Sequence, residues 1–77
     1  MSYLTIDTNT ADEGQLIVAL RDMAAEWSKN RGQCHDFNQG VRYRELREAL
    51  ESRFNVKAHI DTVEHHDDFQ VIVDRSM

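Results

Sequence analysis

The longest regular pattern of apolar positions lies within residues 10–32. Apolar side chains recur there every three or four residues, which places them on one face of a helix. Thr10 and Glu13 have the spacing of a capping box at the start of this run, and Gly32 can adopt the left-handed conformation that ends many helices. The pattern therefore predicts an amphipathic helix with one buried face. Its apolar positions are Leu16, Ile17, Leu20, Met23, Ala24 and Trp27.

A second helical pattern covers residues 41–54. Apolar positions again recur at helical spacing, whereas arginine and glutamate occupy the opposite face. Asp36 and Gln39 form another capping pair, which predicts that this helix begins before its apolar pattern does. Asn55 is suited to the left-handed position that follows a helix. The apolar positions are Tyr43, Leu46, Ala49, Leu50 and Phe54.

Three short segments alternate between apolar and polar residues, which is the pattern of half-buried strands. They are residues 1–7, 56–61 and 69–74, and the polar residues 64–68 between the last two predict a hairpin. The expected fold is a single α+β domain over residues 1–77 with the order β-α-α-β-β. We expect both helices to pack on one face of a small three-stranded antiparallel sheet.

The opposite face of this sheet would have no helix to cover it. Because alternate strand residues point to opposite sides, that face would carry apolar as well as polar side chains. Exposure to solvent is the simpler interpretation. The alternative is a binding surface for another protein or for a second copy of the chain, with Ile72 and Tyr3 near the interface of a homodimer. The residues assigned to partner binding on this face are Tyr3, His59, Val63 and Ile72.

Composition restricts the class of protein. A chain of 77 residues with 40% hydrophobic and 30% charged residues is typical of one folded domain. So short a chain is expected to be marginally stable unless an oligomer, a metal or disulfides add to its stability. The single cysteine, Cys34, cannot form an internal disulfide and suits a reducing cytoplasm. No apolar run reaches the ~20 residues of a membrane span, and no signal peptide is visible. We therefore expect a soluble cytoplasmic protein that does not contact a membrane.

Cysteine and histidine in two polar loops raise the question of a metal site. Cys34 and His35 lie in the first loop, and His65 and His66 lie in the second. Structural zinc sites usually present paired ligands as C-x2-C or H-x3-H, and neither spacing occurs here. Polar loops that contain histidine are the simpler interpretation, so we expect no metal and no cofactor. A metal-binding protein is kept as one alternative.

Arginines cluster near the start of the second helix. Arg42, Arg44 and Arg47 precede a helix end and a hairpin, an arrangement loosely similar to a winged helix, which would make the chain a nucleic-acid-binding regulator. Two observations oppose this interpretation. The net charge is −5, and glutamates interleave with the arginines at spacings that neutralise them within the helix. We therefore do not expect nucleic-acid binding, and keep it as an alternative that would use residues 41–54.

No motif of an enzyme is visible in the sequence. The chain has no glycine-rich phosphate loop and no G-x-S-x-G motif, and a domain of this size has little room for a pocket that encloses a substrate. We therefore expect a protein without enzymatic activity. By elimination, the sequence indicates a small acidic accessory or regulatory protein that binds another protein, as small factors of bacteria and phages do.

Overall fold

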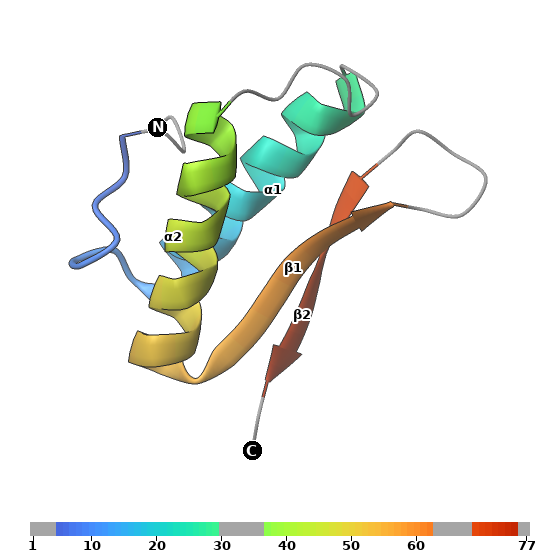
Figure 1. Cartoon of the computed structure of the whole chain (residues 1–77). Helices are drawn as coiled ribbons and strands as arrows, with labels where there is room; N and C mark the ends of the chain where they lie inside the picture. The colour runs from blue at the N-terminus through green and yellow to red at the C-terminus, as the bar shows by residue number, and fades with distance from the viewer. Residues whose placement is uncertain (1–4, 30–36, 63–68, 76–77) are drawn as a thin grey trace.

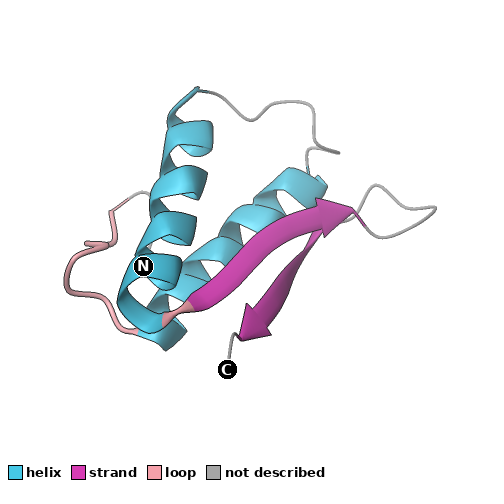
Figure 2. Ribbon diagram, turned by 60° about the horizontal axis from the view of Figure 1, so that its bottom comes forward, coloured by secondary structure: helices cyan, strands magenta, loops and turns pink. Residues whose placement is uncertain are grey.

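The helices form one layer of the molecule and the strands form the other. The computed structural model describes residues 5–29, 37–62 and 69–75. Its elements are α1 (Glu13–Lys29), α2 (Phe37–Phe54), β1 (Val56–Thr62) and β2 (Phe69–Arg75). The strands pair as an antiparallel hairpin, with α1 over β2 and α2 over β1 (Figures 1 and 2). The predicted α+β class is confirmed, with both helices on one side of the hairpin.

Helix α1 begins with a capping box two residues later than the sequence pattern predicted. The N–H of Gln15 donates to the Asp12 carboxylate at 2.7 Å, and the N–H of Asp12 donates to the Gln15 side-chain oxygen at 2.9 Å. These reciprocal bonds satisfy main-chain donors that the start of a helix leaves without intrahelical partners. The assignment of this role to Thr10 and Glu13 is therefore wrong.

A turn around Asp7 explains the shift. The Asp7 carboxylate accepts from the N–H of Asn9 at 2.9 Å, and the Asp7 carbonyl accepts from the N–H of Ala11 at 2.9 Å. Aspartate favours such turns because its side chain can bond the main chain two residues further on. The N–H of Thr10 also donates to the Asp7 carbonyl, at 3.3 Å. Thr10 thus belongs to the turn that precedes the helix.

Helix α2 begins at Phe37, which confirms the predicted start before residue 41. The predicted cap at Asp36 and the predicted end of α1 at Gly32 lie outside the described residues. At the other end of α2, Asn55 has a φ of 55°, and its N–H donates to the Glu51 carbonyl at 3.1 Å. The predicted left-handed cap is confirmed, and it turns the chain directly from α2 into β1.

The hairpin alternates as the sequence predicted. Val56 pairs with Arg75 at one end of the ladder, and Thr62 pairs with Phe69 at the other. One set of alternate side chains is buried or half-buried against the helices: Val56, Ala58, Ile60, Phe69, Val71 and Val73. The other set is exposed and is called the outer face: Lys57, His59, Asp61, Gln70, Ile72 and Asp74.

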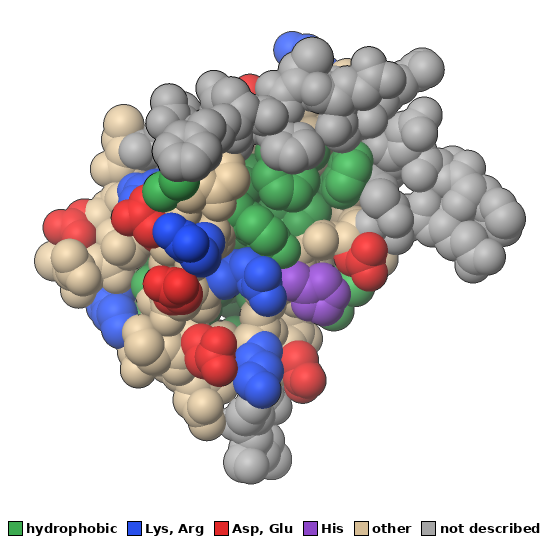
Figure 3. All heavy atoms as spheres, viewed as in Figure 1, with side chains coloured by type: hydrophobic (Ala, Val, Ile, Leu, Met, Phe, Trp, Pro, Cys, Tyr) green, Lys and Arg blue, Asp and Glu red, His purple; other side chains and the backbone are tan. Residues whose placement is uncertain are grey.

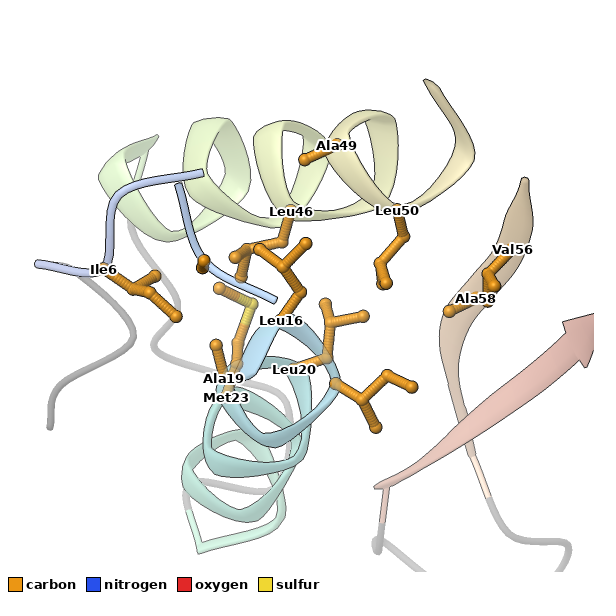
Figure 4. Close-up of a cluster of buried hydrophobic side chains, with 12 residues drawn as sticks. Ile6, Leu16, Ala19, Leu20, Met23, Leu46, Ala49, Leu50, Val56 and Ala58 are labelled. Carbon is orange, nitrogen blue, oxygen red and sulfur yellow. The ribbon is translucent and has the colours of Figure 1, made fainter. Parts of the chain in front are cut away.

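The predicted third strand is not found in the described part of residues 1–7. Residues 5–7 lie in turn and irregular structure, and residues 1–4 lie outside the described residues. Ile6 is only 8% exposed, and Figure 4 shows it beside the helix pair on the side away from the strands. The apolar side chain of Ile6 is therefore buried against the helices without a place in the sheet, so residues 5–7 add no strand to the hairpin.

The core is formed mainly where the two helices face each other. Leu16, Leu20 and Met23 of α1 and Leu46 and Leu50 of α2 are fully buried (Figure 4). These are positions of the apolar patterns from which the two helices were predicted. Neither helix has the length and apolar composition needed to span a membrane.

An aromatic contact joins both helices to the hairpin. The Trp27 ring lies edge-on to Tyr43 of α2, with 5.4 Å between ring centroids, and edge-on to Phe69 of β2, at 5.8 Å. Trp27 itself is half-buried. Edge-to-face pairs of this kind stabilise by about 0.5–1.5 kcal/mol beyond the area that they bury.

Candidate interaction surface

The outer face of the hairpin is the surface on which partner binding was predicted. His59 and Ile72 are paired across the two strands, and Ile72 is 37% exposed. Lys57 is paired with Asp74 in the same way, so opposite charges face each other on this surface. The structure therefore confirms that His59 and Ile72 share one exposed face. The other two predicted residues there, Tyr3 and Val63, lie outside the described residues.

Side chains from α2 cover the outer edge of β1. The Nε of Arg47 donates to the Ala58 carbonyl at 2.9 Å, and the N–H of Ile60 donates to the Tyr43 hydroxyl at 2.9 Å. In an antiparallel pair, the main-chain groups of alternate residues point away from the partner strand, and Ala58 and Ile60 belong to that set. Helix α2 thus closes the middle of this edge to another strand.

Among the described residues, a side chain from outside the hairpin reaches the outer edge of β2 at Phe69, the first residue of the strand. The N–H of Phe69 donates to the Ser28 hydroxyl at 2.7 Å, and Ser28 is also hydrogen-bonded to the Ala24 carbonyl at 2.9 Å. The same alternation directs the main-chain groups of Val71 and Val73 outward from β2. No hydrogen bond from elsewhere in the described residues reaches Val71 or Val73. Within the part of the chain that the structure describes, the outer edge of β2 is therefore open at Val71 and Val73, and we call this part the open edge.

A groove with a volume of about 580 Å³ lies between the exposed side of α2 and strand β1. We call it the charged groove. Figure 3 shows positive and negative side chains interleaved across this side of the molecule, with a histidine among them. Its volume falls in the range of ligand sites, but such sites are usually apolar, whereas this groove is lined mainly by charged residues. The lining residues are Arg44, Arg47, Glu48, Glu51, Lys57, Ala58, His59 and Asp74.

The groove brings together predicted residues that the sequence left apart. Arg44 and Arg47 were assigned to a nucleic-acid alternative and His59 to a protein-binding face, yet all three line the same groove. Arg42 does not line it: its side chain is only 13% exposed and forms an ion pair with Glu45 at 3.8 Å. The predicted cap at Asn55 brings β1 back to the end of α2, but no pattern in the sequence indicates which side of α2 then faces the strand.

The charges of the groove balance. Arg44, Arg47 and Lys57 supply the positive charges, and Glu48, Glu51 and Asp74 supply the negative ones. Arg47 already makes contacts within the molecule: it donates a hydrogen bond to the Ala58 carbonyl, and its guanidinium lies 5.1 Å from the centre of the Tyr43 ring. The site is therefore strongly polar without a predominant sign of charge.

The residues considered for a metal site, Cys34, His35, His65 and His66, all lie outside the described residues. In residues 5–29, 37–62 and 69–75, no group of three or more histidine, cysteine, aspartate or glutamate side chains could hold a metal ion. The described part of the chain thus offers no metal centre to which a function could be assigned.

Comparison with known proteins gives no relative. No protein-family model, curated protein or solved structure matches the chain.

Proposed function

We propose that the chain is a small non-enzymatic accessory or regulatory protein of the cytoplasm, of the kind found in bacteria and phages, that acts by binding another protein. The contact surface is the charged groove together with the adjoining outer face of the hairpin. One observation carries this proposal: the groove interleaves three positive and three negative side chains where α2 meets β1. A surface of this kind suits a partner that carries both signs of charge.

The same observation disfavours the nucleic-acid alternative. A phosphate backbone is uniformly negative, and proteins that bind it neutralise several phosphates with lysine and arginine. Here Glu48, Glu51 and Asp74 would repel phosphates from the arginine side of the groove. The chain as a whole is acidic, with a net charge of −5. Protein binding is therefore the better explanation of this surface.

A protein partner would find polar and apolar chemistry on adjacent parts of this surface. Charged groups across an interface determine orientation and suppress wrong partners, because like charges brought together cost several kcal/mol. Ile72 is paired with His59 of the groove and provides an exposed apolar side chain next to it. Interfaces commonly combine a small apolar centre with a polar rim in this way.

A charge swap tests the proposal without a change in composition. Arg44→Glu combined with Glu48→Arg inverts the pattern of the groove but keeps the net charge and a pair of opposite charges four residues apart. Arg21→Asp combined with Asp22→Arg is the matched control on α1, because both of these residues are exposed and outside the groove. Each variant is immobilised beside the wild type and exposed to a lysate of the native host.

The expected result is a protein retained by the wild type and the α1 control but not by the groove variant. Titration of that purified protein should give affinity at least tenfold weaker for the groove variant, since one unfavourable charge contact of about 1.4 kcal/mol has this effect. Equal binding by all three proteins would contradict the role of the groove. Retention that nuclease treatment abolishes would instead identify a nucleic-acid-binding protein.

A further inference from the structure

The residue types along the open edge of β2 read the same in both directions. Residues 70–74 read Gln-Val-Ile-Val-Asp, so that polar, valine, isoleucine, valine and polar positions follow each other in either direction from Ile72. Such a segment presents the same sequence of residue types to a second copy that runs antiparallel to it. The main-chain groups of Val71 and Val73, on either side of Ile72, are those that point out from the edge.

We propose that two copies of the chain associate through their β2 strands, antiparallel and with Ile72 of one copy opposite Ile72 of the other. Val71 of each copy exchanges main-chain hydrogen bonds with Val73 of the other, which satisfies the outward groups that the hairpin leaves open. The product is a twofold four-stranded sheet with the order β1-β2-β2-β1. A contact of this type uses the same surface on both copies, as twofold dimers require.

The neighbouring residues select this register among those that the alternation of β2 allows. A shift that centres the pair on Val71 would place Phe69, whose N–H Ser28 already holds, opposite Val73 of the copy and so remove a hydrogen bond next to the centre. With Ile72 at the centre, Phe69 falls at the end of the pairing instead, opposite Arg75 of the copy. A shift that centres it on Val73 would set the exposed Ile72 opposite the Asp74 carboxylate of the copy. With Ile72 at the centre, valines face valines on the inner side and isoleucine faces isoleucine on the outer side.

Charge complementarity favours the same arrangement at its ends. Gln70 of one copy lies opposite Asp74 of the other, so an amide donor meets a carboxylate and no like charges are opposed. A pair centred on Asp74 would bring two carboxylates together and is disfavoured for that reason. The outer edges of the four-stranded sheet are then the two β1 edges, which Arg47 and Tyr43 already cover.

This dimer differs from the stacking of two sheet faces. Edge-to-edge pairing leaves both outer faces exposed and joins them into one surface, with a charged groove near each end. Ile72 and Asp74 take part in both surfaces, whereas Arg44 and Glu48 of the groove lie on α2, outside the β2 pair. The charge swap at Arg44 and Glu48 therefore tests the groove without altering the pairing at β2, and each proposal can fail alone.

Single cysteines test the register directly in a Cys34→Ser background. Residues opposite each other in a non-hydrogen-bonded antiparallel pair have Cα atoms about 4.5 Å apart, which a disulfide can bridge. Ile72→Cys should therefore form a disulfide-linked dimer under mild oxidation. Gln70→Cys alone should not, since two residues at position 70 would be about 13 Å apart along the strands. Gln70→Cys mixed with Asp74→Cys should form the mixed dimer.

Sedimentation measures the mass of the wild type in solution and completes the test. At a protein concentration of about 100 μM, we expect the mass of two chains. Val73→Pro removes one outward N–H and should sediment as a single chain, with circular dichroism to show that it is folded. A wild type that is monomeric at this concentration, or a Gln70→Cys protein that cross-links as readily as Ile72→Cys, would overturn the proposal. The charge-swap experiment on the groove would keep its meaning in either case.

Discussion

At the scale of single residues, Asp12 is the side chain on which the start of α1 depends. Its carboxylate accepts the N–H of Gln15, and Gln15 returns a bond to the N–H of Asp12. Replacement of an N-cap by alanine costs about 1 kcal/mol, which in a domain of this size lowers the melting midpoint by roughly 4 to 8 °C. We expect this decrease for Asp12→Ala in a thermal melt followed by circular dichroism.

Thr10→Ala is the control for this prediction. Thr10 is exposed, and the bond that it makes in the turn comes from its main-chain N–H, which alanine retains. The melting midpoint should therefore stay within about a degree of wild type. A larger decrease for Thr10→Ala than for Asp12→Ala would show that the helix starts where the sequence pattern placed it.

The position of this cap shows what residue patterns can and cannot predict. Two overlapping boxes, Thr10 with Glu13 and Asp12 with Gln15, fit the start of α1 equally well by residue type. The turn at Asp7 decides between them, because it places Thr10 before the helix. Two capping pairs thus compete for the same helix start. The apolar pattern of the helix cannot decide between them, because it carries no information about the turn that precedes the helix.

At the scale of elements, Arg53 connects the end of α2 to the segment that precedes α1. Its Nη1 donates to the Thr8 carbonyl at 2.7 Å and to the Ala11 carbonyl at 2.6 Å. Hydrogen bonds to charged groups contribute about 1.5–3 kcal/mol each. Arg53→Ala should therefore accelerate amide hydrogen exchange in the turn before α1 by roughly tenfold or more, because local opening of that turn becomes easier.

The amides of Asn9 and Ala11 are suitable reporters, since both donate to Asp7 in the native turn. Arg44→Ala removes the same charge from the exposed side of α2 and should leave their exchange unchanged. If both variants accelerate exchange equally, the effect comes from loss of charge, and the proposed connection is wrong.

The helices and the hairpin were predictable from the sequence because each carries several repeats of its own period. Helix α1 shows six apolar positions in one face, and both hairpin strands alternate over six residues. The segment of residues 1–7 alternates too, but it offers only Leu4 and Ile6 as inner positions. Ile6 is buried beside the helices instead. At residues 5–7, tertiary packing therefore outweighs the short strand pattern.

At the scale of the whole molecule, the proposed dimer makes stability depend on protein concentration. An assembly that forms only between folded chains stabilises them by mass action. A tenfold rise in concentration should raise the melting midpoint of the wild type by about 3 to 5 °C in the range where the dimer forms. Ile72→Lys places two ammonium groups at the centre of the pair, so its midpoint should not change with concentration.

The charged groove could not be located from the sequence, although its members were visible. Arg44 and Arg47 have helical spacing and Lys57 and His59 have strand spacing, and no local pattern states that one side of α2 lies next to β1. That placement depends on long-range contacts, including the bond from Arg47 to the Ala58 carbonyl. A candidate site formed between two elements is visible only once their packing is known.

Ser28, Tyr43 and Arg47, which cover parts of the hairpin edges, also affect how the chain folds during its synthesis on the ribosome. Synthesis proceeds from the amino end, so α1 and α2 leave the ribosome before the strands do. A two-stranded hairpin by itself is barely stable in water, and its open edges can pair with other nascent chains. In this protein the side chains that occupy those edges are already available when β1 emerges. The order of elements thus shortens the time during which the new strands are exposed to aggregation.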